Sequence, residues 1–140
     1  VIGASCDTNE VHFAWLNTPK NNGGIEGVTY PLLADTTRNL SAALDILDAE
    51  WVYDADLNDE ILEGSNVTFR ATYLIDETGK IFHESVNDMP LGRNVNEYLR
   101  LIDAYTHVQT KGEVCPANWE EGKEAMSADR NSTAAYLASH

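Results

Sequence analysis

The segment "TFRATYLIDETGKIFHESVND", residues 68–88, contains two runs rich in β-branched and aromatic residues on either side of "ETGK". Apolar and polar residues alternate in both runs, and a period of two is typical of strands. Gly79 lies in the connection, where a tight turn needs a residue that tolerates positive φ. The segment therefore predicts a β-hairpin, an antiparallel pair of strands in the middle of the chain.

Strands and helices alternate on the N-terminal side of this hairpin. The apolar run at residues 1–5 predicts a buried strand, and residues 30–35 predict a second strand. A helix is predicted after each strand, one capped within residues 7–8 and the other within residues 36–37. Residues 48–67 are acidic, show no clear period, and are predicted to be irregular.

The C-terminal side begins with the clearest helical pattern of the chain. In residues 94–109, "NVNEYLRLIDAYTHVQ", apolar side chains recur on one face and Asn94 is placed to cap the helix. The tail from Glu120 is polar, with a weak helical pattern near "STAAYLASH". Alternating strands and helices followed by an antiparallel pair predict an α/β fold with a mixed β-sheet flanked by helices.

The composition limits the class of protein. A chain of 140 residues with 43% hydrophobic content is long enough to form a packed globule. A formal charge of -14 argues against nucleic acid as a partner, because phosphate backbones are also negative. No apolar run is long enough to span a bilayer. Two cysteines cannot form a disulfide framework, so we expect a reducing cytoplasm.

Metal binding is not expected. Asp54, Asp56 and Asn58 have the alternate spacing of an EF-hand loop, but Asp59 stands where that loop needs Gly and Ser65 where it needs Glu. The four histidines share no ligand spacing with one another or with a cysteine. They are His12, His83, His107 and His140.

The candidate chemistry lies in the cysteines and two arginines. Cys115 lies in "KGEVCPANW", a Gly-, Pro- and Asn-containing loop predicted to be accessible, whereas Cys6 follows an apolar run and is expected to be a buried, inert thiol. Arg70 interrupts an apolar strand, so either it meets an acceptor-rich partner or it lies at an edge with its head in solvent. Arg93, just before a helix, has the same two interpretations. If the arginines converge on a thiol, they lower its pKa.

Several segments resemble the peroxiredoxins, and the typical 2-Cys branch with the alkyl hydroperoxide reductase C-type enzymes most of all. These segments are "NTPKNNGGIEG…YPLLAD", "FRATYLID", "VNDMPLGRNVNEYLRLIDA" and "GEVCPANW", in order from Val1 to about Trp119. The resemblance implies a thioredoxin-like fold and a thiol peroxidase that reduces hydrogen peroxide and alkyl hydroperoxides. It also implies a core over residues 1–110 and a resolving-cysteine segment and tail over residues 111–140.

The resemblance assigns roles to three residues. Cys115 matches the resolving cysteine, which condenses with a sulfenic acid on the partner subunit to form an intersubunit disulfide. Arg70 matches the arginine that stabilises the reactive thiolate and the peroxide, and Arg93 matches the second arginine of that pocket. The implied partners are a second copy in an antiparallel homodimer, a decameric ring, and thioredoxin or a flavoprotein disulfide reductase. No cofactor and no metal are implied.

The chain departs from the family pattern at the reactive cysteine. The Pro-x-x-x-Thr-x-x-Cys motif is absent, and Cys6 is not assigned to it because Gly3 stands where the motif has Thr. We therefore expect the peroxidatic cysteine upstream of Val1. The alternative, if the chain begins at Val1, is a non-catalytic thioredoxin-fold scaffold or holdase. The acidic segment at residues 48–67 is also longer than the usual link in the family.

Overall fold

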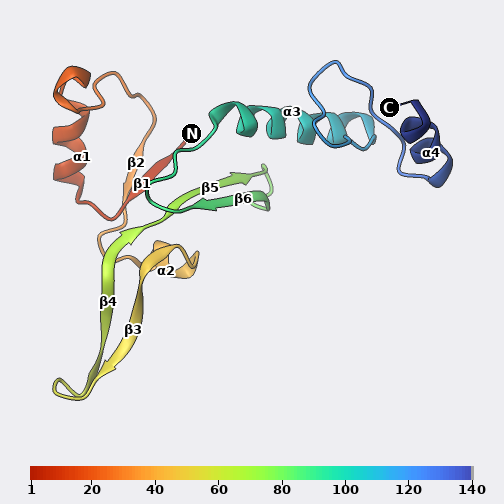
Figure 1. Ribbon diagram of the computed structural model, residues 1–140. Coiled ribbons are helices and arrows are strands. Elements are labelled where there is room, and N and C mark those ends of the chain that lie inside the picture. Colours follow the sequence, from red (N-terminus) through yellow and green to blue (C-terminus); the bar gives the residue numbers. More distant parts are fainter. Residues whose placement is uncertain (140) are drawn as a thin grey trace. The chain divides into compact units, whose positions relative to one another are not determined.

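The computed structural model describes residues 1–139 and divides the chain into two compact units. The first unit comprises Val1–Thr72 and Glu84–Gly92, and the second comprises Tyr73–His83 and the residues from Arg93 onward. Figure 1 labels the elements of both units. The boundary predicted between residues 110 and 111 separates a core from a cysteine-bearing segment rather than two compact units, and it stays a prediction.

The first unit begins with two parallel strands that are connected in the chain through a helix. Strand β1 (Gly3–Ser5) pairs with β2 (Leu32–Ala34), and α1 (Asn9–Leu16) lies between them in the chain (Figure 1). The hydroxyl of Thr8 accepts the backbone N–H of Val11, which confirms the predicted cap. The predicted burial of the first strand is wrong. It has three residues, and the preceding Val1 and Ile2 are 97% and 74% exposed.

The second predicted helix is shorter than expected, and its cap is a different residue. Helix α2 spans only Asn39–Ala43, and its first backbone N–H groups are bound by the carboxylate of Asp35 rather than by a threonine. Asp35 Oδ2 accepts the N–H of Ser41 at 2.8 Å and the hydroxyl of Ser41 at 2.6 Å. Leu47, predicted to lie on the apolar face of this helix, instead opens a strand.

Residues 48–67 are not irregular, and this prediction is wrong. Strand β3 (Leu47–Asp54) pairs with β4 (Asp59–Thr68) in a long antiparallel hairpin, drawn in yellow and light green in Figure 1. A register shift occurs between Leu47 and Ala49. Gly64 has a φ of 142° and lies so close to Ala49 that a Cβ there would be 2.6 Å from the Ala49 Cα. The hairpin therefore needs glycine at this position.

The hairpin predicted at residues 68–88 is confirmed. Strand β5 (Arg70–Ile75) pairs with β6 (Ile81–Asn87), and Gly79 lies in the turn with a φ of 87°. The carboxylate of Asp76 organises this turn, because its Oδ1 accepts the backbone N–H groups of Thr78 and Lys80 and the Thr78 hydroxyl.

The second unit is built on the helix that was predicted most clearly. Helix α3 (Val95–Lys111) begins after Asn94, whose side chain accepts the N–H of Asn96, and ends at Gly112 with a φ of 69°. Tyr105 stacks on Phe82 with ring centroids 3.9 Å apart. The weak pattern near the end of the chain forms α4 (Arg130–Ser139).

The strands confirm an α/β class but not a single mixed sheet. Among residues 1–139 they form three two-stranded sheets, one parallel (β1–β2) and two hairpins (β3–β4 and β5–β6). The buried apolar side chains of this part of the chain are Ile46 and Trp119, 8% and 2% exposed. Over the same residues, no helix is long and apolar enough to cross a membrane.

Candidate functional site

The segment that carries Cys115 is a closed loop that follows α3. Val114 and Met126 form an isolated antiparallel bridge, with N–H···O distances of 2.7 and 3.1 Å in the two directions. This bridge joins the two ends of the loop and so closes it. We call residues 114–126 the cysteine loop.

An arginine of α3 fastens the cysteine loop to the helix. Nε and Nη2 of Arg100 each donate to the carboxylate of Glu97 at 2.7 Å. The third nitrogen, Nη1, donates to the backbone carbonyl of Trp119 at 2.9 Å. Since two hydrogen bonds to Glu97 fix the guanidinium plane, the third bond holds Trp119 in a defined place. The Trp119 indole is 2% exposed and donates to the carbonyl of Lys123 at 3.1 Å.

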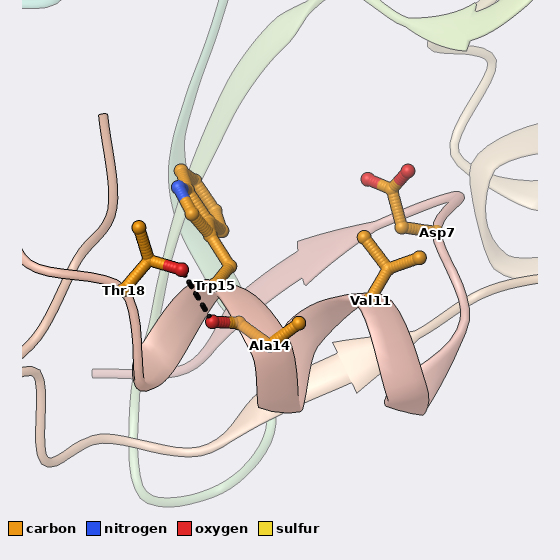
Figure 2. A pocket seen from close by; sticks show the side chains of 5 residues that line it. All are labelled: Asp7, Val11, Ala14, Trp15 and Thr18. Atoms are coloured by element: carbon orange, nitrogen blue, oxygen red, sulfur yellow. Dashed lines mark hydrogen bonds between the residues drawn. The ribbon is translucent and has the colours of Figure 1, made fainter. Parts of the chain in front are cut away.

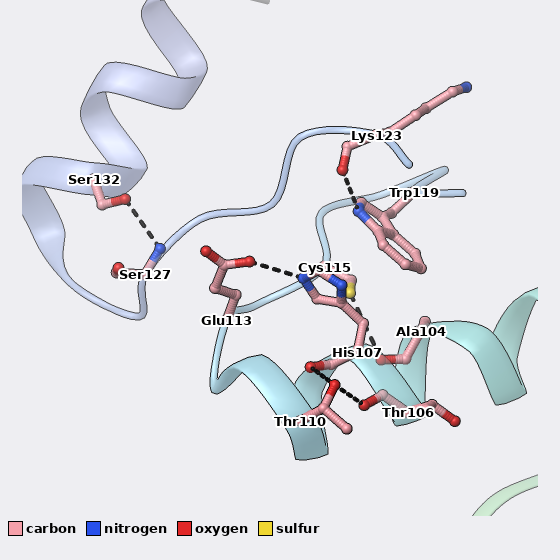
Figure 3. Close-up of polar contacts among 10 residues, drawn as sticks. All are labelled: Ala104, Thr106, His107, Thr110, Glu113, Cys115, Trp119, Lys123, Ser127 and Ser132. Atoms are coloured by element: carbon pink, nitrogen blue, oxygen red, sulfur yellow. Dashed lines mark hydrogen bonds and ion pairs between the residues drawn. The ribbon is translucent and has the colours of Figure 1, made fainter. Parts of the chain in front are cut away.

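A histidine two turns further along α3 contacts the residue before the cysteine loop and the buried tryptophan within it. His107 Nε2 lies 2.8 Å from Oε2 of Glu113, and the His107 ring packs on Trp119 with centroids 4.9 Å apart (Figure 3). Arg100, Ala104 and His107 have the i, i+4, i+7 spacing of one helical stripe. That spacing is visible in the sequence, but the sequence analysis did not use it, and it missed this set of contacts.

Cys115 itself is half-buried against α3. Its thiol donates to the carbonyl of Ala104 with an S···O distance of 3.7 Å (Figure 3). Burial raises the pKa of Cys115 above its usual value, and the charge of Glu113 raises it further, against the opposing charge of Arg100. The group is therefore held as a neutral thiol at pH 7. A thiol that attacks peroxide directly needs a lowered pKa instead.

The two arginines lie in different units. Arg70 opens β5 with an exposed side chain, and its Nε donates to the Met89 carbonyl at 3.2 Å, so the edge interpretation is correct within the first unit. Arg93, also exposed, lies in the second unit between β6 and α3. Since the units are described separately, the predicted convergence of these arginines stays a prediction.

Cys6 is a free thiol in the first unit. It is half-buried rather than buried, which corrects the expectation, and its Sγ lies 3.8 Å from the hydroxyl oxygen of Ser41. Ser41 in turn donates to the buried carboxylate of Asp35. Burial raises the pKa of Asp35, but the hydrogen bonds from Ser41 and Leu40 and the charge of Arg38 more than offset it and leave the pKa below its usual value.

Two surface hollows accompany these elements. One of about 430 Å³ lies along α1, lined by Asp7, Val11, Ala14, Trp15 and Thr18, and the Thr18 hydroxyl donates to the Ala14 carbonyl (Figure 2). The other, of about 320 Å³, lies beside the cysteine loop. It is lined by Pro116, Ala117, Asn118, Trp119, Lys123, Glu124 and Tyr136.

No cluster of three or more metal-ligating side chains occurs among the described residues, which exclude His140. The acidic residues with EF-hand spacing lie in the β3–β4 hairpin. There Asp54 Oδ1 accepts the backbone N–H groups of Asp56 and Leu57, so this carboxylate shapes the turn.

Comparison with sequence families covers most of the chain. The sequence model of the AhpC/TSA family matches residues 1–84, and that of the C-terminal domain of 1-Cys peroxiredoxin matches residues 104–139. The second match includes α3 from Ala104 onward, the whole cysteine loop and α4.

Individual relatives carry related names. Alkyl hydroperoxide reductase C of Helicobacter pylori is 42% identical over 98% of this chain and 62% of its own length. The human protein named thioredoxin-dependent peroxide reductase, mitochondrial, is 43% identical over 85% of this chain and 41% of its own length. The reduced 2-Cys peroxiredoxin of Plasmodium vivax superposes with a TM-score of 0.83 at 37% identity, over 98% of this chain and 63% of that structure. The chain thus spans a little over three fifths of the first of these relatives.

Proposed function

The chain belongs to the AhpC/TSA family of peroxiredoxins and has their thioredoxin-like α/β fold, and from this premise we propose that the protein is a thiol peroxidase. Its substrates are hydrogen peroxide and alkyl hydroperoxides. A cysteine thiolate attacks the outer peroxide oxygen, the O–O bond breaks, and a sulfenic acid is formed, while the departing oxygen takes up a proton and leaves as water or an alcohol.

Cys115 is the second thiol of this reaction, not the first. The observation that supports this role is the neutral, half-buried thiol held against the Ala104 carbonyl in a loop fastened to α3. In the resolving step the Cys115 sulfur attacks the sulfenic sulfur of the partner subunit. An S–S bond forms, the S–O bond breaks, and the hydroxyl leaves as water with the proton of the thiol.

The first thiol belongs to a part of the protein outside Val1–His140. Cys6 is not a candidate in this proposal, because no Thr stands three residues before it, as the family motif requires. Arg70 and Arg93 stabilise the thiolate and the departing peroxide oxygen in this proposal, each as a fixed positive charge. Both residues are exposed in the units to which they belong.

The remaining partners follow from the family. A second copy forms the antiparallel homodimer in which the disulfide joins two subunits, and dimers assemble into a decamer. Thioredoxin or a flavoprotein disulfide reductase returns both thiols by exchange. We retain the cytoplasm as the compartment, on the basis of the free cysteines; one relative is named as mitochondrial.

Substitution of Cys115 tests the proposal directly. Brief exposure of the whole protein to peroxide is expected to give a disulfide-linked dimer on a non-reducing gel, and Cys115→Ser is expected to abolish this dimer while leaving the first turnover with peroxide intact. Cys6→Ser is the matched control, because it removes the other free thiol, and it is expected to leave the dimer unchanged. An undiminished dimer band in Cys115→Ser would exclude Cys115 as the resolving thiol.

A further inference from the structure

The β3–β4 hairpin carries a charge of one sign only. Residues 47–68 contain seven carboxylates and no Lys or Arg, and the nearest cations in the sequence are Arg38 and Arg70. The carboxylates are Asp48, Glu50, Asp54, Asp56, Asp59, Glu60 and Glu63. Among residues 1–139, the ion pairs found are Glu97–Arg100, His107–Glu113 and Glu120–Lys123, all outside this hairpin.

The register of the hairpin separates its side chains onto two faces. Directly opposed residues share a face, and successive residues of a strand alternate between faces. Trp51 is opposite Leu62, and Tyr53 is opposite Glu60, so these four side chains share one face. We call it the aromatic face.

The other face of the hairpin carries two pairs of opposed carboxylates, on either side of the apolar pair Val52 and Ile61, and we call it the acidic face. Glu50 is directly opposite Glu63, and Asp54 is directly opposite Asp59. Like charges in directly opposed positions destabilise a hairpin, so these pairs are unfavourable in the isolated protein. A cation bound to the hairpin would relieve this repulsion, because a two-stranded ribbon is thin and the charges of both faces contribute to its field.

The aromatic face is open to solvent. Trp51 is 62% exposed and Tyr53 is 63% exposed, in a chain whose buried apolar side chains include another tryptophan, Trp119. The Tyr53 hydroxyl donates to Oδ1 of Asn58 at 2.7 Å, which fixes the phenol ring over the end of the hairpin. Glu60 lies beside that ring with an exposed side chain. Two exposed aromatic rings on one face, one of them fixed and directly opposite a carboxylate, form a surface suited to a guanidinium group.

We propose that the β3–β4 hairpin is a docking surface for an arginine-bearing segment of a partner protein. An arginine side chain of the partner lies over the rings of Trp51 and Tyr53 and pairs with the carboxylate of Glu60. The acidic face adds a long-range attraction that favours a basic segment. The same hairpin of a second copy is a poor occupant, because it carries the same seven carboxylates and no Lys or Arg. This surface is independent of Cys115 and of the peroxidase proposal.

Binding of labelled peptides to the whole protein tests the proposal. The probe is a fluorescein-labelled eight-residue peptide of alternating arginine and glycine, and its lysine counterpart is the comparison. Fluorescence anisotropy at physiological ionic strength is expected to show tighter binding of the arginine peptide, because a guanidinium stacks on aromatic rings and an ammonium does so less well. Equal affinity for both peptides would overturn the role given to the aromatic face.

Variants on the two faces separate local recognition from general attraction. Glu60→Gln and Glu63→Gln remove the same charge from neighbouring residues on opposite faces. Glu60→Gln is expected to weaken binding of the arginine peptide several-fold more than Glu63→Gln. Equal effects of the two substitutions would show that net charge alone attracts the peptide, and the proposal would be wrong.

The rings are tested without any change of charge. The double variant Trp51→Ser/Tyr53→Ser is expected to weaken binding roughly tenfold, whereas Trp51→Phe/Tyr53→Phe, which keeps both rings, is expected to retain most of the affinity. The phenylalanine variant remains informative if the serine variant does not fold, since full loss of binding with both rings present would contradict the proposal. A lower oligomer mass of the serine variant in sedimentation velocity would identify a second copy as the occupant instead.

Discussion

At the scale of single residues, the protonation of Cys115 is the property with the clearest functional meaning. Burial raises the pKa of this thiol, and its proton is donated to the Ala104 carbonyl. In the proposed resolving role, a thiol that stays neutral does not compete for peroxide, and we expect it to become reactive if the cysteine loop leaves α3 and burial is lost. The contacts of Trp119 therefore control access to Cys115.

Trp119→Ala is expected to release the cysteine loop. Truncation of a buried tryptophan lowers stability by about 3–5 kcal/mol. This loss exceeds the free energy with which a few hydrogen bonds hold a loop in place. In a Cys6→Ser background, we measure alkylation of Cys115 at about pH 7.5, which is below the usual thiol pKa of about 8.5. The rate of alkylation is expected to increase at least about tenfold. Trp51→Ala is the matched control, because Trp51 is 62% exposed, and it is expected to leave the rate unchanged. Equal rates in the two variants would mean that Trp119 does not hold the loop.

At the scale of elements, the turn between β5 and β6 is tied to α3 by one carboxylate. Tyr105 donates its hydroxyl proton to Oδ2 of Asp76 at 2.8 Å, while the other oxygen binds the turn. The hydrogen bonds from Thr78 and Tyr105 lower the pKa of Asp76 to about 2. The ionised form is the one that holds hairpin and helix together.

The pKa of Asp76 predicts how stability depends on pH. Because the folded-state pKa lies below the unfolded value, this group stabilises the fold fully above about pH 4, and the contribution is lost as the pH falls towards 2. Asp76→Asn is expected to be less stable than the parent at pH 7 in urea unfolding, with the difference shrinking towards pH 2. A stability difference for Asp76→Asn that is constant with pH would contradict this assignment.

Gly64 is expected to be necessary for the β3–β4 hairpin. A Cβ at this position would lie 2.6 Å from both the Ala49 Cα and the Asp48 carbonyl oxygen, and these backbone atoms cannot move without breaking the register. Gly64→Ala is expected to lower the free energy of unfolding by about 1–3 kcal/mol. Gly92→Ala is the control, because a Cβ at Gly92 meets nothing within 4 Å. Similar urea midpoints for the two variants would show that the hairpin tolerates the shift.

Local signals in the sequence predicted some elements well and failed for others. Helix α3 was predicted with its cap, because its apolar period extends over several turns and Asn94 precedes it. The β3–β4 hairpin was missed because carboxylates occupy many of its positions. In addition, Asn58 and Asn66, which both have positive φ, interrupt the alternation of apolar and polar residues in the sequence. The pattern of residues 36–47 predicted a helix of full length, whereas Asp35 caps only a short helix and Leu47 pairs in a strand.

The contacts around Cys115 could not be predicted from the sequence, for a physical reason. The motif "GEVCPANW" identified the thiol, and the resemblance gave it a role. The raised pKa depends on burial against Ala104, and the fastening depends on the rotamers of Arg100 and His107. Neither burial nor rotamers can be read from spacing alone.

At the scale of the whole molecule, charge is expected to govern assembly. Residues 1–140 of each copy carry a formal charge of -14, so these parts of two copies repel one another at long range, and salt screens this repulsion. We expect the assembled fraction to rise in sedimentation velocity between about 0.02 M and about 0.3 M salt. Glu50→Gln/Glu63→Gln, which removes two charges from the hairpin, is expected to shift assembly to lower salt. Dissociation by salt would instead indicate an interface held by complementary charges.

The burial of Trp119 has an optical consequence. Water stabilises the excited state of an indole, so a dry indole emits at shorter wavelength than a wet one. Trp15 and Trp51 are 44% and 62% exposed, and Trp119 is 2% exposed, so the short-wavelength part of the intrinsic fluorescence belongs to the cysteine loop. A red shift of that emission in stopped flow would report the loop leaving α3, and in the proposed mechanism this shift is expected before the disulfide of Cys115 forms.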